Sequence, residues 1–177
     1  MEFSYELKIP KDRIAVLIGR KGEIKKELEE RTNTNISIDS KEGDVVISGE
    51  DALGLYDARS VIIAVARGFN PEVALSLLKQ DFALEIINIP DFAGKSNNSS
   101  VRLKGRVIGK EGKSRVTIED LTETYISVYG KTIAIIGEAS NVLNAKRAVE
   151  SLLKGGTHAS VYKWLERKRR ELKRNPL

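Results

Sequence analysis

Two short turns carry residue types that can bind a phosphate group. Gly19-Arg20-Lys21-Gly22 and Gly109-Lys110-Glu111-Gly112 share the spacing GxxG, and an isoleucine, Ile18 or Ile108, precedes each turn. Glycine lets another backbone approach closely, and exposed N–H groups at the start of a following helix attract negative charge. Basic side chains within the turns add positive charge. The pattern predicts two sites that bind the phosphates of a phosphodiester chain.

The spacing alone is weak support for this interpretation. With 14 glycines in 177 residues, chance gives about one GxxG spacing per chain. Glycines in a tight turn between helices can also serve backbone geometry alone. The context favours binding, because both turns follow an apolar residue, lie between helical patterns and precede matching strand patterns at the same distance.

The turns belong to a repeat that extends through most of the chain. At an offset of 90 residues, threonines and a short apolar strand recur: Thr32, Thr34 and residues 36–38 match Thr122, Thr124 and residues 126–128. Residues 45–50 match 133–138 at an offset of 88. Ile9-Pro10 matches Ile89-Pro90 at an offset of 80, which predicts roughly ten inserted residues over 91–100 of the second copy, interpreted as a loop.

Each copy has the same order of predicted elements: strand, helix, GxxG, helix, strand, strand, helix. Apolar periodicity and breaker residues place strands over 5–9, 35–39 and 44–48 and helices over 11–18, 23–31 and 51–67 of the first copy. In the second copy they place a strand over 84–89, helices near 102–108, 113–121 and 140–153, and a hairpin over 125–136. Residues 71–79 are predicted to form a short connecting helix.

This order, with Ile-Gly-x-x-Gly between paired helices, resembles the type I KH domain up to about Lys154. The resemblance implies an α+β fold with two domains, 1–80 and 81–177, each a three-stranded antiparallel sheet packed against three helices, plus a basic C-terminal helix. It also implies a groove for about four nucleotides of single-stranded RNA. Its expected floor is Ile18, Leu28 and Ile36 in the first copy and Ile108, Ile118 and Ile126 in the second.

The expected RNA-binding residues combine the two turns with nearby cations. Six basic residues and one acid lie within residues 102–115, whereas residues 1–157 as a whole hold 23 basic and 23 acidic groups. Local clustering of this kind is the electrostatic footprint of a nucleic-acid site. The candidates are Ile18, Gly19, Arg20, Lys21, Gly22, Lys25, Arg102, Lys104, Arg106, Ile108, Gly109, Lys110, Glu111, Gly112, Lys113 and Arg115.

Two features of these candidates depart from the expected pattern. A KH motif has an apolar residue three positions after the second glycine, where this chain has Lys25 and Arg115. Either the second helix is rotated or shifted, or these side chains reach the nucleic acid themselves. Glu111 is unfavourable near a phosphate, and Lys113 and Arg106 are expected to offset it.

Three stretches also resemble the archaeal members of the partner-of-Nob family, small-subunit ribosome biogenesis factors related to the Krr family. They are residues 91–96 (DFAGKS), 106–113 and 125–132 (YISVYGKT). The resemblance implies binding to the 3′ region of small-subunit rRNA during late maturation. It implies two protein partners, the alpha subunit of translation initiation factor two and a pre-rRNA endonuclease.

The C-terminal segment has a separate basic character. Helical spacing over 160–174 places Val161, Trp164, Leu165 and Leu172 on one side, and Trp164 and Leu165 are expected to dock on the second repeat. Residues 158–177 contain seven Lys or Arg and two Glu. The run 167–170 fits contact with RNA phosphates, an acidic partner or a solvated face.

Enzyme classes find little support in the sequence. There are no cysteines and one histidine, His158, expected in a surface linker, so thiol chemistry and His-based triads or metal sites are excluded. Two Gly-Lys-Ser sequences suggest a phosphate-binding loop of nucleotide-hydrolysing enzymes, but Val107 and Ile89 stand where that loop needs glycine. We expect a non-enzymatic protein without cofactor or metal. A single-stranded DNA-binding protein or a protein-binding adaptor in translation initiation stays open as an alternative.

Composition indicates the compartment and the source. The N-terminus lacks the pattern of a signal peptide, and no apolar run reaches the roughly 20 residues of a membrane span, so a cytoplasmic protein is expected. Gln80 is the single glutamine among abundant Lys, Arg and Glu, a composition that favours a thermophilic source. A melting temperature in the ordinary mesophilic range would contradict that expectation.

Overall fold

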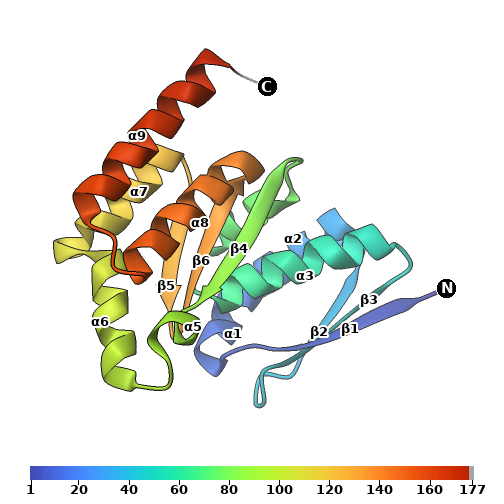
Figure 1. Cartoon of the computed structure of the whole chain (residues 1–177). Coiled ribbons are helices and arrows are strands. Elements are labelled where there is room, and N and C mark those ends of the chain that lie inside the picture. The colour runs from blue at the N-terminus through green and yellow to red at the C-terminus, as the bar shows by residue number, and fades with distance from the viewer. Residues whose placement is uncertain (176–177) are drawn as a thin grey trace. The chain divides into compact units, whose positions relative to one another are not determined.

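The computed structural model describes residues 1–175 of the chain (Figure 1). It divides into two compact units, the first Met1–Gln80 and the second beginning at Asp81.

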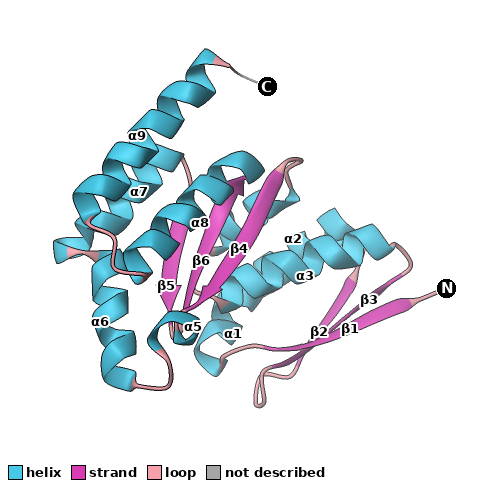
Figure 2. Cartoon of the chain, viewed as in Figure 1, coloured by secondary structure: helices cyan, strands magenta, loops and turns pink. Residues whose placement is uncertain are grey.

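The first unit contains a three-stranded antiparallel sheet with the order β1-β3-β2 (Figure 2). Its strands are β1 (Phe3–Lys8), β2 (Asn35–Ile38) and β3 (Asp44–Gly49). Ile47 of the central strand lies opposite Tyr5 on one side and Ile36 on the other. Val45 and Ile47 are fully buried while Val46 between them is exposed, because successive side chains of a strand face opposite sides. One face of the sheet therefore forms the core.

Three helices supply the rest of this core: α1 (Lys11–Ile18), α2 (Glu23–Thr32) and α3 (Ala52–Ala66). Asp51 caps α3 by accepting a hydrogen bond from the Leu53 N–H. Arg13 of α1 donates to the carbonyl oxygens of Val65 (2.8 Å) and Phe69 (2.7 Å) at the other end of α3, where backbone acceptors lack helical partners. The short α4 (Pro71–Leu75) and a 3₁₀ turn, Ser76–Leu78, end the unit.

The second unit repeats the sheet with the order β4-β6-β5, in which β4 is Phe82–Asn88, β5 Tyr125–Tyr129 and β6 Thr132–Glu138. The helices are α5 (Pro90–Ala93), α6 (Asn97–Ile108), α7 (Lys113–Thr122), α8 (Ala139–Leu153) and α9 (His158–Arg174). Ile118 of α7, Ile135 of β6 and Leu152 of α8 are fully buried in one core. The predicted fold class, two α+β units and a C-terminal helix, is confirmed.

The prediction of a loop over residues 91–100 is wrong, because these residues are mostly helical. Pro90 opens α5 at a position where its missing N–H has no cost. Ser96 caps α6, accepting a hydrogen bond from the Ser99 N–H. Helix α6 therefore starts five residues before the predicted 102.

Buried threonine pairs explain part of the repeat. The Thr32 hydroxyl contacts the Leu28 carbonyl (2.6 Å) and the Thr34 hydroxyl (2.8 Å). Thr122 does the same with Ile118 (2.7 Å) and Thr124 (2.7 Å). Because a buried hydroxyl needs a partner, the two threonines of each copy satisfy one another at the end of the second helix.

Helix α9 packs on the second unit through its apolar side. Val161 and Leu165 are buried in the core of that unit, and Trp164 is half-buried against it. The predicted docking of this helix is thus observed. Over residues 1–175, no helix combines the length and apolar character needed to cross a membrane.

Candidate nucleic-acid interface

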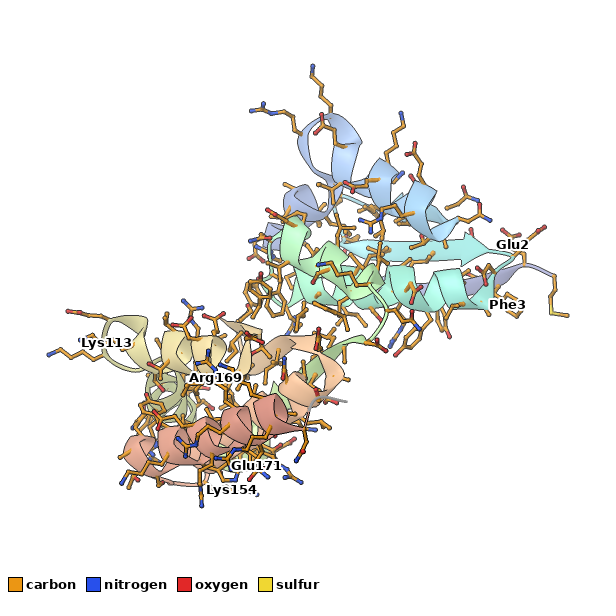
Figure 3. The ribbon with its side chains drawn as sticks, turned by 90° about the horizontal axis from the view of Figure 1, so that it is seen from above. Glu2, Phe3, Lys113, Lys154, Arg169 and Glu171 are labelled. Atoms are coloured by element: carbon orange, nitrogen blue, oxygen red, sulfur yellow. The ribbon has the colours of Figure 1, made fainter. Side chains whose placement is uncertain are left out.

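The two GxxG turns have the same backbone conformation. Gly19 and Gly109 end the preceding helices with φ of 78° and 76° and ψ of 174° in both. Gly22 and Gly112 precede α2 and α7 with φ of 76° in both. A 3₁₀ turn lies between the glycines of each pair. The basic side chains of the turns are exposed, and Figure 3 shows Lys113 at the outer end of the second unit's turn.

The two glycines of each turn have different surroundings. A Cβ atom added to Gly19 would lie 2.4 Å from Cγ1 of Ile24, and one added to Gly109 would lie 2.6 Å from Cβ of Ser114. A Cβ atom on Gly22 or Gly112 would meet nothing within 4 Å. The first glycine is therefore required for packing of the turn against the following helix, whereas the second faces open space.

Backbone conformation alone does not explain the second glycine. Lys21 and Glu111, in the middle of the turns, also have positive φ, 54° and 57°, a conformation that side chains tolerate at a modest cost. A non-glycine residue is thus accepted one position earlier in the same turn. The open space at Gly22 and Gly112 leaves room for the backbone of a ligand.

Lys25 and Arg115 are engaged within their own helices. Lys25 Nζ lies 3.2 Å from Glu29 Oε1, and Arg115 Nη1 lies 2.8 Å from Glu119 Oε1. The inward positions of α7 begin at the buried Ser114, two residues after Gly112, and half-buried Ile24 holds the same place in α2. The departure from the KH pattern is therefore a shift of the inward position by one residue.

Glu29 and Glu119 were not singled out from the sequence, yet each joins a helix to an edge strand. The second carboxylate oxygen of Glu29 accepts the Ile36 N–H (2.9 Å), and that of Glu119 accepts the Ile126 N–H (2.9 Å). A signal was available, because each glutamate lies four residues after a basic residue on the same helix face. Both also match at the repeat offset.

We expect the change Glu119→Ala to destabilise the second unit by roughly 1–3 kcal/mol, because it leaves the partly buried Ile126 N–H without its acceptor. Glu119→Gln keeps an acceptor oxygen and is expected to cost less. Denaturant unfolding followed by the fluorescence of Trp164, the single tryptophan, measures both. Equal losses in the two variants would contradict this role.

Arg106 has a structural role that differs from its expected one. Its Nε donates to the Leu152 carbonyl (2.9 Å) and its Nη2 to the Gly156 carbonyl, which ties α6 to the end of α8. His158 Nε2 lies 2.8 Å from the Arg106 carbonyl oxygen. The prediction that His158 lies in a surface linker is wrong, since it is the half-buried first residue of α9.

The other cations of residues 102–115 do not form a single surface. Arg102 and Lys104 are two positions apart on α6, which separates their directions by about 200° around the helix axis. Lys110 and Lys113 are exposed at the turn. Sequence clustering therefore overstates the number of cations that one ligand can reach.

The expected apolar floor is mostly core. Leu28 and Ile118 are fully buried, and Ile36 and Ile126 are 4% exposed, so none of the four can stack with a base without rearrangement. Ile18 and Ile108 are partly exposed beside the turns. They are the two members of the set that can contact a ligand directly.

The geometry does not support a nucleotide-hydrolysing enzyme or a metal site. Both sheets are antiparallel, Gly112 follows a helical turn rather than a strand, and Gly94 follows α5, so neither Gly-Lys-Ser sequence has the strand–loop–helix setting of a phosphate-binding loop. In the part of the chain that the structure describes, no group of three or more His, Asp or Glu side chains is placed to hold a metal ion.

Comparison with protein-family models gives two matches. Residues 4–64 match the KH domain, and residues 83–170 match the eukaryotic type KH-domain, described as KH-domain type I. A KH domain-containing protein of Methanocaldococcus jannaschii is 53% identical over 172 residues, covering 95% of this chain and 75% of that protein. The pre-rRNA-processing protein PNO1 of Candida albicans is 31% identical over 113 residues, covering 63% of this chain and 41% of that longer protein.

A solved structure shares nearly the whole fold. It is a chain of the a/eIF2alpha-aDim2p-rRNA complex of Pyrococcus horikoshii, with a TM-score of 0.89 and 46% identity over 97% of this chain and 96% of that one. Two antiparallel sheets, each with a pair of helices joined by a GxxG turn between its first strand and the other two, define the class of tandem type I KH-domain proteins. The chain belongs to this class and, within it, to the family that includes PNO1 and aDim2p. The family resemblance predicted from the sequence is confirmed.

Proposed function

We propose that this protein binds single-stranded RNA through its two GxxG turns, without catalysing a reaction. The observation that carries the proposal is the open space at Gly22 and Gly112, flanked by exposed cations and by the first turns of α2 and α7. Neither helix has a side-chain cap at its N-terminus. The first N–H of each helix, on Glu23 or Lys113, donates to the carbonyl oxygen of Arg20 or Lys110 within the turn, so the N–H groups that follow it are proposed to bind a phosphate oxygen.

The proposed contact set is narrower than the sequence suggested. It comprises the two turns, their flanking isoleucines and the cation after the second turn: Ile18, Gly19, Arg20, Lys21, Gly22, Ile108, Gly109, Lys110, Glu111, Gly112 and Lys113. Lys25 and Arg115 are retained at its edge, because their side chains are still about one third exposed while paired with glutamates. Arg102 and Lys104 are peripheral, and Arg106 is left out.

The proposed target is small-subunit rRNA near its 3′ end, bound during ribosome maturation in the cytoplasm. Support comes from the relatives: one carries the name of a pre-rRNA-processing protein, and a neighbour with 46% identity was solved in a complex with rRNA. The KH groove holds about four nucleotides. Each of the two units is proposed to act as one such module.

Affinities for a short single-stranded RNA, the same sequence as DNA, and a duplex test the proposal. We expect RNA to bind most tightly, with an affinity that falls as salt rises because phosphate contacts release counterions. Tighter binding of DNA would favour the DNA-binding alternative. Binding of none of the three would overturn the proposal.

A second candidate function is that of an adaptor for the alpha subunit of translation initiation factor two, as the composition of the Pyrococcus horikoshii complex suggests. Calorimetry of this chain with that subunit, with and without the RNA, tests it. Failure to bind in both conditions would exclude this partner. The pre-rRNA endonuclease stays a prediction from the family resemblance alone.

A further inference from the structure

Helix α9 carries a row of four basic residues on the side that faces away from the core. Lys163, Arg167, Arg170 and Arg174 are spaced by four, three and four residues, and all four are exposed. At 3.6 residues per turn this spacing places them along one face. We call this row the α9 stripe. The buried residues of the helix, Val161 and Leu165, lie on the opposite side.

No stripe residue forms an ion pair within residues 1–175, although Glu166 and Glu171 flank the stripe on the same helix. Among the ion pairs of residues 1–175, the one on α9 joins Lys168 to Glu171, at 3.3 Å, and neither residue belongs to the stripe. No acidic residue occupies a stripe position. A linear array of unpaired cations creates a positive potential suited to a polyanion.

The helix that carries the stripe starts beside the last turn of α6, which leads into the second GxxG turn. Helix α9 begins at His158, which contacts the Arg106 carbonyl three residues before Gly109. Farther along, Leu165, Arg169 and Lys173 line a groove together with Leu121, Thr122 and Glu123 at the end of α7, the helix that begins at this turn. Helix α9 therefore runs beside α7 in the same direction. From Lys163 to Arg174 the stripe spans about 17 Å, the length of about five stacked nucleotides.

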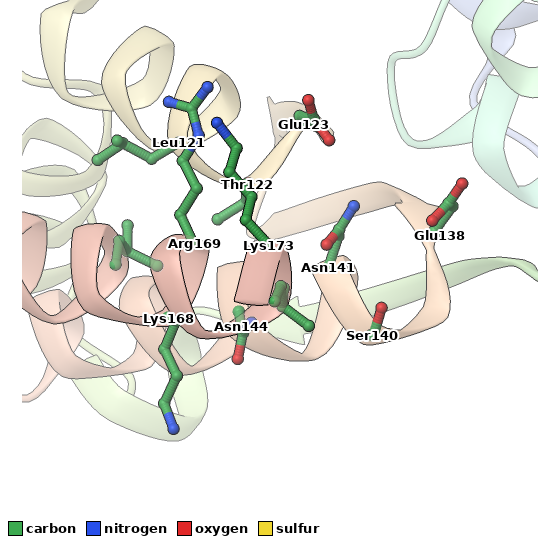
Figure 4. A pocket seen from close by; sticks show the side chains of 12 residues that line it. Leu121, Thr122, Glu123, Glu138, Ser140, Asn141, Asn144, Lys168, Arg169 and Lys173 are labelled. Carbon is green, nitrogen blue, oxygen red and sulfur yellow. The ribbon is translucent and has the colours of Figure 1, made fainter. Parts of the chain in front are cut away.

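The groove itself is a weaker candidate for an anion. It has a volume of about 350 Å³ and is lined by three cations, Lys168, Arg169 and Lys173, but also by Glu123 and Glu138. Figure 4 shows Lys168 pointing away from the other lining residues, whereas Arg169 and Lys173 point toward the end of α7. The remaining charges balance, so the groove offers no net attraction for phosphate.

We propose that the α9 stripe binds phosphates of the same single-stranded RNA that occupies the second GxxG turn, which rests on the function proposed above. Three of its four residues are arginine, whose planar guanidinium binds phosphate through two parallel hydrogen bonds. Contacts to phosphates fix the position of the strand and add affinity but do not read its sequence. The stripe therefore lengthens the bound segment beyond the four nucleotides of the KH groove.

Two triple variants test this proposal on the full chain. The variant K163Q/R167Q/R170Q removes three charges from the stripe. The matched control K95Q/R147Q/K154Q removes three exposed charges of the same unit that do not belong to the stripe, two of which, Arg147 and Lys154, lie near Trp164 on another side of α9. Each is measured against a four-nucleotide RNA and a twelve-nucleotide RNA over a series of salt concentrations. For a single strand, the log–log salt slope of affinity changes by about 0.7 for each phosphate contact.

For the twelve-nucleotide RNA, we expect the stripe variant to bind at least tenfold more weakly and its salt slope to fall by about 2. The control variant is expected to match the unmodified protein, and the four-nucleotide RNA is expected to bind all three alike. Equal salt slopes of the two variants on the longer RNA would overturn the proposal. It would also be overturned if the stripe variant bound RNA normally and lost only its binding to the alpha subunit of the initiation factor. If the unmodified protein binds neither RNA, the function proposed above fails instead.

Discussion

Replacing Gly112 with aspartate lowers the affinity for single-stranded RNA by roughly ten- to a hundredfold and leaves the second unit folded. The added carboxylate enters the open space beside the turn, where a Cβ atom meets nothing within 4 Å. It repels the phosphate that the first turn of α7 would bind, and hydrogen bonds to a charged group contribute about 1.5–3 kcal/mol. Fluorescence anisotropy with a labelled RNA measures the change.

The control for this variant is Gly112→Ala. An alanine at this position keeps the same positive φ of 76° but adds neither charge nor much bulk. The affinity of the alanine variant for RNA is therefore expected to fall far less. Gly22→Asp is the corresponding change in the first unit, and comparing the two aspartate variants shows how much each unit contributes. A folded Gly112→Asp protein with unaltered affinity would refute the placement of phosphate at this turn.

Replacing Gly109 with alanine destabilises the second unit by about 2–4 kcal/mol, through steric overlap and backbone strain together. A Cβ atom there would lie 2.6 Å from Cβ and 2.7 Å from the backbone nitrogen of Ser114, and φ is 76°. Gly112→Ala causes the backbone strain without the steric overlap, so it is expected to destabilise the unit by about 1 kcal/mol.

The measurement is urea unfolding followed by the fluorescence of Trp164. This single tryptophan packs against the core of the second unit, so its signal reports that unit even if the two units unfold separately. Gly19→Ala in the first unit is the specificity control and is expected to leave the Trp164 transition unchanged. Losses of the same size in Gly109→Ala and Gly112→Ala would show that the two glycines do not have the distinct roles described above.

Local patterns were sufficient to predict most of the fold. The apolar periodicity of 11–18 coincides with α1, and that of 51–67 contains α3, since buried faces repeat every three to four residues. Residues 91–100 lack such periodicity, so the apolar pattern predicts a loop there. Their helices depend on Pro90 and the cap at Ser96, which are local signals that a search for apolar stripes does not weigh.

The candidate site was predictable at the level of the backbone but not of the side chains. Glycine spacing located both turns because no other residue type could replace the glycine packed against Ile24 or Ser114. The partners of Arg106 lie 46 and 50 residues further along the chain, so only the tertiary structure reveals that its guanidinium is occupied. The same limit applies to Leu28 and Ile118, which the sequence cannot assign to a groove floor or to a core.

The bonds of Arg106 bear on how this protein can be divided into fragments. A polypeptide cut after Lys154, where the KH resemblance ends, would lose the Gly156 acceptor of that guanidinium and uncover the core position filled by Leu165. The final helix is thus part of the folded core of the second module. A fragment of this module made for crystallisation or spectroscopy needs to retain α9. Charge substitutions on the outer face of α9 change the helix without unfolding the domain.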